Sequence, residues 1–262
     1  MIAQQTLTRS YVEDVAIDPE TGAIYVAGYD NKYNSLDNNP VQVAFLTGFD
    51  GKLNTQWSSW GYEADTLTDG QNDMADTRGY RVTVGRDGQL YYLGEVAGGN
   101  SIYRWDGKDR STETLVKYDA YNDPYNSKSP HQTYYARINP ETGEVLQGQL
   151  ALARLSSGDS NAVRVYEGSI TADEAGNVYI GGRAFSGVAG RDQQTINGEA
   201  VGEYAKADPF ALVVSSDFQS RKNWTTFVKD GGQGTINGFA VGEGRAAIVG
   251  TINQGTVITN QH

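Results

Sequence analysis

One short segment recurs four times along the chain, and this repetition constrains the fold more than any other feature. Each copy has a glycine, a run of mainly apolar residues, and a second glycine six positions after the first. The copies span residues 22–28, 88–94, 176–182 and 244–250, and their second glycines are 66, 88 and 68 residues apart. Such self-similarity is typical of folds built from one repeated supersecondary unit.

Each copy predicts the second strand of a β-hairpin whose first strand lies just before it. The preceding stretches carry alternating apolar residues and end in a polar turn. They are Val12–Asp18, Tyr80–Val84, Gly168–Thr171 and Asn237–Val241. The turns place Asp or Pro early and Gly late, as in Asp18–Gly22, which is typical of a type I turn closed by a glycine with positive φ.

A second hairpin is expected after three of the copies, each time opened by an aromatic residue. Its first strands begin at Phe45, Tyr135 and Phe210. The predicted unit is therefore a four-stranded antiparallel meander. Its first two strands carry apolar side chains on both faces, so each sheet needs a neighbour on each side. Sheets stacked radially around an axis meet this need, which predicts an all-β fold of the β-propeller class.

We expect a small propeller of four blades, each of four antiparallel strands, in a single domain over residues 1–262. The blade units are about 10–60, 78–152, 166–228 and 236–260, and residues 4–9 complete the last blade. This N-terminal strand would close the ring. The alternative is a fragment of a larger ring. A closed ring would bring the two ends together, as suits one module of a larger polypeptide.

The third copy carries the most distinctive sequence. Asp173–Gly182 has the pattern Asp-x-x-Gly-Asn-Val-Tyr-Ile-Gly-Gly, and Phe210-Ala-Leu-Val-Val and Asn223-Trp-Thr-Thr follow it. This pattern resembles the bacterial β-propeller repeat known as SBBP, which the other copies resemble more weakly. The resemblance implies a propeller and an extracellular or cell-surface location in a bacterium, and it implies no catalytic residues. The units here are longer than the family's, and four are fewer than its seven blades.

Composition excludes several classes of function. The 32 acidic and 21 basic residues give a net charge of −11, which argues against nucleic acid or an anionic membrane surface as the partner. No stretch reaches the roughly 18 consecutive apolar residues of a membrane span, so we expect no membrane insertion. Cysteine is absent, and the only internal histidine, His131, has no nucleophile motif beside it. We therefore single out no catalytic residue.

The extra length of the chain falls in the connections that are expected on one face of the propeller. They are residues 29–40, 61–79, 95–134, 153–165 and 183–207. The turns expected on the other face are short. Because binding usually resides in long loops on a rigid scaffold, we expect the loop-bearing face to be the functional one.

The 95–134 connection is rich in residue types that bind sugars or peptides. Aromatic faces stack on the apolar side of a sugar ring, and carboxylates accept hydrogen bonds from hydroxyls. The candidate ligand-binding residues are Tyr103, Trp105, Asp106, Tyr118, Asp119, Tyr121 and Tyr125. The alternative is that the aromatic residues pack the loop onto the blades, since a long ordered loop must bury apolar surface.

Residues 61–76 contain five acids and no base. Clustered oxygen donors suit a divalent cation, which makes Asp65, Asp69, Asp73 and Asp76 candidate calcium ligands. The segment lacks the ligand spacing of an EF-hand, and a solvated acidic loop is the alternative. We expect no other cofactor.

The sequence thus predicts a non-catalytic interaction module of a bacterial surface protein, adhesin or appendage, which binds a glycan or a protein on its loop-bearing face. Two alternatives remain open. One is a carbohydrate-active enzyme that uses paired carboxylates on that face. The other is a spacer, or the outer domain of a filament, with no ligand.

Overall fold

The computed structural model describes residues 6–35, 38–68, 73–116, 131–155, 157, 159–185, 188, 190–203 and 207–258. Over these residues the regular structure is almost all β-strand, with very little helix, as predicted. One short helix, α1 (Ala64–Leu67), and two 3-10 turns, Ile102–Arg104 and Arg191–Gln193, interrupt it. No helix among the described residues is long and apolar enough to cross a membrane.

Among the described residues, three four-stranded antiparallel meanders follow one another, with the strand order that the repeat predicts. Sheet 1 contains β1 (Tyr11–Ile17), β2 (Ile24–Tyr33), β3 (Pro40–Phe49) and β4 (Thr55–Trp60). Sheet 2 contains β5 (Thr77–Val84), β6 (Leu90–Val96), β7 (Gln132–Ile138) and β8 (Val145–Ala151). Sheet 3 contains β11 (Val163–Ala172), β12 (Val178–Ala184), β15 (Asp208–Val214) and β16 (Arg221–Thr226).

The fourth copy of the repeat forms a long two-stranded hairpin, β17 (Val228–Gly242) and β18 (Arg245–Val257). We call it the final hairpin. Two small hairpins lie in the connections. They are β9 (Ala153–Arg154) with β10 (Ser160–Asn161), and β13 (Thr195–Ile196) with β14 (Glu199–Ala200).

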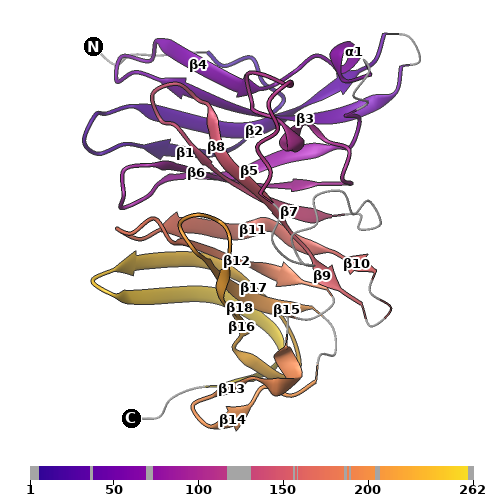
Figure 1. Ribbon diagram of the computed structural model, residues 1–262, viewed down its shortest axis with the longest axis vertical. Helices are drawn as coiled ribbons and strands as arrows, with labels where there is room; N and C mark the ends of the chain where they lie inside the picture. The colour runs from indigo at the N-terminus through magenta and orange to yellow at the C-terminus, as the bar shows by residue number, and fades with distance from the viewer. Residues whose placement is uncertain are drawn as a thin grey trace.

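The sheets pack face to face in chain order, from sheet 1 at the top of Figure 1 to the final hairpin in its lower half. At each junction the first strand of one unit lies against the first three strands of the unit before it. Thus β5 contacts β1, β2 and β3, β11 contacts β5, β6 and β7, and β17 contacts β11, β12 and β15. Sheets 2 and 3 are therefore buried on both faces, which explains why their strands are apolar on both sides.

The two glycines of the repeat have different roles. The first, as at Gly88, has a positive φ of 76° in the turn between the first two strands. The second, as at Gly94, lies opposite a register shift in the first strand, between Gly79 and Arg81. This bulge brings the carbonyl oxygen of Arg78 within 3.0 Å of where a Cβ on Gly94 would be. Only glycine fits there, and the same backbone approach recurs at Gly28, Gly182 and Gly250.

The ring closure that we expected is not found among the described residues. Residues 6–9 form no strand, and the final hairpin pairs only with itself. The N-terminal stretch instead lies on its own sheet 1. Leu7 packs against Val26, Phe45 and Phe49, and the guanidinium of Arg9 donates to Asp30 at 2.8 Å. Apolar burial and an ion pair thus hold this stretch to sheet 1, at the opposite end of the stack from the final hairpin (Figure 1).

Candidate functional site

The short turns and the long connections lie on opposite faces of the stack. The turns between first and second strands and between third and fourth strands lie toward the left of Figure 1. The described parts of the long connections lie toward its right or, for β13 and β14, at its bottom. We call the left side the turn face and the right side the loop face. The turns are residues 18–23, 50–54, 85–89, 139–144, 173–177, 215–220 and 243–244.

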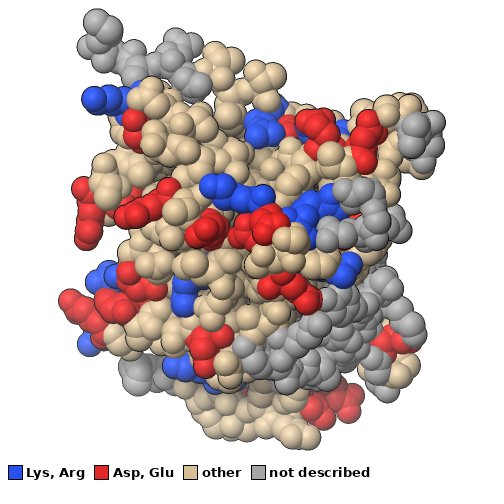
Figure 2. All heavy atoms as spheres, turned by 45° about the horizontal axis from the view of Figure 1, so that its top comes forward, with Lys and Arg blue, Asp and Glu red and all other residues tan. Residues whose placement is uncertain are grey.

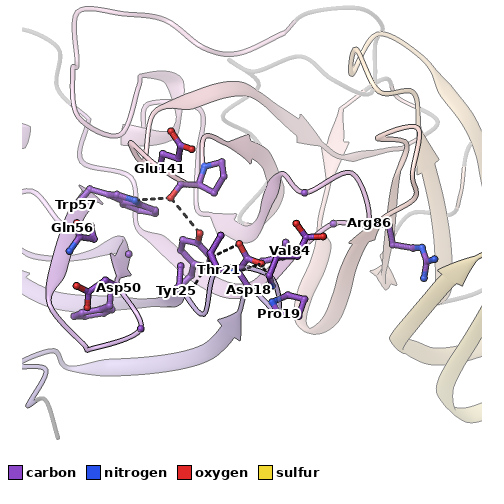
Figure 3. Close-up of a pocket in the computed structure, with 18 residues that line it drawn as sticks. Asp18, Pro19, Thr21, Tyr25, Asp50, Gln56, Trp57, Val84, Arg86 and Glu141 are labelled. Carbon is purple, nitrogen blue, oxygen red and sulfur yellow. Dashed lines mark hydrogen bonds between the residues drawn. The ribbon is translucent and has the colours of Figure 1, made fainter. Parts of the chain in front are cut away.

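A hollow of about 870 Å³ opens on the turn face between sheets 1 and 2. Four turns line it, two from each of these sheets, so its walls are fixed by the packing of one meander on the next (Figure 3). The lining includes Asp18, Glu20, Thr21, Tyr25, Phe49, Asp50, Gln56, Trp57, Arg86 and Glu141. Sequence reasoning missed this hollow, because it is made of the short turns that we took to be structural.

Two aromatic residues and a proline form a rigid wall of the hollow. The indole Nε1–H of Trp57 donates to the carbonyl oxygen of Pro140 at 2.9 Å, and the hydroxyl of Tyr25 lies 3.5 Å from the same oxygen. The two rings are tilted, with centroids 5.9 Å apart. Both side chains are buried, so they present edges to the hollow and leave no broad face on which a sugar ring could stack.

The carboxylates of Asp18 and Asp50 cap their own turns. Asp18 accepts hydrogen bonds from the hydroxyl of Thr21 at 2.6 Å and from the amide of Glu20 at 2.8 Å. Asp50 accepts from the side chain and the amide of Asn54, each at 2.8 Å. The Thr21 hydroxyl lowers the pKa of Asp18, and the Asn54 side chain lowers that of Asp50. Both therefore stay ionised near neutral pH and are poor proton donors.

Glu20 and Glu141 stand at the rim as exposed carboxylates. Figure 3 shows Glu141 above Trp57, and Arg86 on the opposite side of the view from Trp57. The guanidinium of Arg86 pairs with Glu174. The one cation of the lining is thus already neutralised, while the rim carboxylates face solvent.

Acidic residues dominate the whole turn face. The carboxylates in its turns are Asp18, Glu20, Asp50, Asp87, Glu141, Glu144, Asp173, Glu174, Asp217 and Glu243. The same turns contain two basic residues, Lys52 and Arg86, and three more, Arg221, Lys222 and Arg245, stand at the start of adjoining strands. The ammonium of Lys108 also reaches this face, where it donates to the carbonyl oxygen of Thr142 at 2.7 Å. Figure 2 shows acidic groups along the left edge of the molecule, on the side where these turns lie, with basic groups between them. The turn face therefore attracts cations.

The structure places three of the predicted ligand-binding residues in structural contacts. Tyr103 is fully buried and stacks on Tyr134, with centroids 4.0 Å apart. Burial raises the pKa of the Tyr103 hydroxyl. Asp106 is buried and accepts from the amide of Val145 at 2.7 Å. Trp105 donates to Asp73 at 2.7 Å. Tyr103 therefore packs the connection onto the blades, which was our alternative interpretation. Tyr118, Asp119, Tyr121 and Tyr125 lie outside the described residues.

The predicted calcium ligands are engaged separately. The carboxylate of Asp65 accepts a hydrogen bond from the hydroxyl of Ser35 at 2.7 Å, and this bond lowers the pKa of Asp65. Asp73 is fully buried and pairs with Arg110 at 3.0 Å. Asp76 accepts from the amide of Gln42 at 2.8 Å. Asp69 lies outside the described residues. Within the part of the chain that the structure describes, no group of three or more acids or histidines could hold a metal ion.

A buried carboxylate joins sheets 2 and 3 near the loop face. Glu95, at the end of β6, is 1% exposed and accepts from the guanidinium of Arg164 at 3.0 Å and from the amide of Val165 at 2.6 Å. His131 lies 3.5 Å from the same carboxylate. Burial acts to raise the pKa of Glu95, but these donors outweigh it and the pKa is lowered. The carboxylate of Glu95 therefore stays ionised, and its hydrogen bonds to Arg164 and Val165 hold sheet 2 against sheet 3.

Comparison with known proteins adds little to this geometry. No protein-family model matches the chain, and no curated protein matches it. Among solved structures it is similar to the crystal structure of BamB from Moraxella catarrhalis, with a TM-score of 0.26 and 10% sequence identity. The match covers 99% of this chain and 79% of that one. A TM-score at this level indicates nothing about the function of this chain.

Proposed function

We propose that this protein is a non-catalytic binding module that docks a basic segment of a partner protein on its turn face, over the hollow between sheets 1 and 2. The observation that carries the proposal is the rim of exposed carboxylates, Glu20 and Glu141, around a concave site with rigid walls. The site combines preformed shape with unneutralised charge of one sign. Such a site favours lysine and arginine side chains.

Within the hollow, the state of Asp18 and Asp50 supports binding over catalysis. A glycoside hydrolase needs one acid whose pKa is raised, so that it can donate a proton, beside one that is ionised. In the hollow the hydrogen bonds to Asp18 and Asp50 lower both pKa values. These two groups are hydrogen-bond acceptors and do not form an acid and base pair.

A lysine-rich fluorescent peptide tests the proposal by fluorescence anisotropy at low and at high salt. We expect binding at low salt that weakens as salt rises, because the charges are exposed. The double variant Glu20→Gln/Glu141→Gln should bind about 2- to 30-fold more weakly, since each exposed ion pair contributes roughly 0.2–1 kcal/mol.

The matched control is Asp192→Asn/Glu203→Gln, which removes two exposed carboxylates from the loop-face connection between β12 and β15. Equal weakening in both double variants would mean that the peptide responds to net charge alone, and the assigned site would be wrong. Binding of neutral soluble polysaccharides without peptide binding would indicate a glycan module. Binding of neither would indicate a spacer.

We also propose that the stack belongs to the β-propeller class and works on a bacterial surface. The face-to-face packing of successive meanders supports the first statement. The second rests on the resemblance of residues 173–182 to the SBBP repeat.

A further inference from the structure

The two ends of the stack present different faces, and the repeat itself pairs such faces at every junction inside the chain. We infer that a second copy of this chain docks head to tail, with the final hairpin of one copy packed on β1 and β2 of the next. The inference follows from the register of the strands and does not depend on the function of the turn face.

We define two faces for each unit. The leading face contacts the preceding unit, and the trailing face contacts the following one. In sheet 2 the leading face includes Val82 and Tyr92, which pair across β5 and β6 and pack in one buried cluster with residues of sheet 1. In sheet 3 the corresponding pair is Ile170 and Ile180, which pack in a buried cluster with residues of sheet 2.

Sheet 1 has the same leading face but no preceding unit among the described residues. Val15 pairs with Val26 as Val82 pairs with Tyr92, and Ile17 pairs with Ile24 beside them. Val15 is 52% exposed and Ile17 is 62% exposed, whereas Val82 and Ile170 are 4% and 6% exposed. Leu7 covers the neighbouring Phe45 and Phe49 on β3. The β1 edge of this face thus remains an open patch of branched aliphatic side chains.

The trailing face of each unit contains the residues one and three positions before the second glycine of its repeat. In sheet 1 they are Ala27 and Tyr25, which pack in the cluster shared with sheet 2. In sheet 2 they are Leu93 and Tyr91, which pack in the cluster shared with sheet 3. In sheet 3, Tyr179 contacts Phe239 of the final hairpin, with centroids 6.2 Å apart.

The final hairpin carries the same positions at Val249 and Ala247, and both are exposed, Val249 by 66%. It therefore offers a trailing face with no following unit among the described residues. All three junctions between the described sheets join a leading face to the trailing face before it. The exposed β1 edge of the leading face of sheet 1 and the exposed trailing face of the final hairpin are therefore the two halves of a fourth junction.

A polar contact at the existing junctions supports the same pairing. The residue after the second glycine reaches the first strand of the following unit. Glu95 accepts from Arg164 and from the amide of Val165, and Arg183 donates to the carbonyl of Gly234 at 3.1 Å. In the final hairpin this position is Thr251, which is exposed. In the proposed contact Thr251 faces the β1 backbone of the next copy.

Two copies joined in this way form a heterologous interface, which gives a closed ring or an open filament. Sedimentation velocity over a micromolar concentration series tests the proposal. We expect the wild-type chain to form oligomers, and Val15→Asp and Val249→Asp each to abolish them. An equimolar mixture of the two variants should form dimers, because one intact leading face then meets one intact trailing face.

Leu146→Asp is the matched control. Leu146 is an aliphatic residue on β8, in the middle of the stack, and is 47% exposed, so this substitution should leave the oligomers unchanged. Circular dichroism checks that each variant folds. If one does not, Ile17→Asp replaces the leading-face variant and Ala247→Asp replaces the trailing-face variant.

The absence of native cysteine gives a second measurement. Chains with Val15→Cys and chains with Val249→Cys should cross-link to each other on mild oxidation, in preference to linking with their own kind. A wild-type chain that stays monomeric across the series overturns the inference. So does an oligomer that Val15→Asp abolishes and Val249→Asp leaves intact, because the leading face would then pair with itself.

Discussion

Replacing Glu95 with Gln tests whether the junctions between sheets hold the stack together. The glutamine keeps a carbonyl that can accept from the amide of Val165. It removes the charge that now faces Arg164 at 3.0 Å and His131 at 3.5 Å. Hydrogen bonds to charged groups contribute about 1.5–3 kcal/mol, and breaking a buried pair costs roughly 3–5 kcal/mol. Because Arg164 is 26% exposed, water compensates part of this loss.

We therefore expect Glu95→Gln to lower the free energy of unfolding by about 2–3 kcal/mol. For a chain of 262 residues, this corresponds to a fall in Tm of roughly 4–12 °C. Urea unfolding followed by circular dichroism measures the first quantity, and a thermal melt measures the second. The control is Glu203→Gln, an exposed carboxylate on the loop face.

The pH dependence gives an independent check of the same contact. The pKa of Glu95 is lowered in the folded protein, so its stabilising effect is complete above the ordinary glutamate pKa and is lost as pH falls through the folded value. Wild type and Glu95→Gln should therefore converge in stability under acidic conditions. Ordinary surface substitutions change the free energy of unfolding by less than about 0.5 kcal/mol. A difference that small between wild type and Glu95→Gln at neutral pH would refute the reasoning.

Three further outcomes follow from the contacts described above. Gly94→Ala places a Cβ within 3.0 Å of the Arg78 carbonyl oxygen. Gly88→Ala has open space around it and only places alanine at a positive φ, which costs about 1 kcal/mol. In urea unfolding, Gly94→Ala should therefore lower the free energy of unfolding more than Gly88→Ala does. Tyr103→Ala empties a fully buried site and should cost about 3–5 kcal/mol without changing peptide affinity in the anisotropy assay. Asp50→Ala removes a carboxylate of lowered pKa, so in thermal melts the loss of stability below about pH 4 should be smaller than in wild type.

The hairpins and their order were predictable from the sequence because glycine spacing reports backbone geometry directly. A glycine such as Gly88 marks a positive φ, and one such as Gly94 marks a bulge that leaves no room for a side chain. Strand ends were harder to predict. Residues 29–33 continue β2 and pair with residues 40–44 of β3, where we expected a loop. Their polar residues resemble a connection, and only the cross-strand pairing shows that they are strand.

Ring closure and the site depend on contacts that a repeat pattern does not encode. The stretch around Leu7 has the composition of an outer strand, yet it packs on Phe45 and pairs Arg9 with Asp30. The hollow was missed for a similar reason. Asp18 and Asp50 are ordinary turn residues in the sequence, and they become neighbours of one cavity only because sheet 2 packs on sheet 1. Tyr103 of the 95–134 connection was taken for a binding residue because its burial is invisible in sequence.

The uniform rule by which successive meanders join has a consequence for how such a chain can grow. Because every unit receives its neighbour through the same positions relative to its second glycine, duplicating one unit inside the gene would lengthen the array without creating a new kind of surface. Length would then be free to vary by whole units, while the two terminal surfaces kept their character.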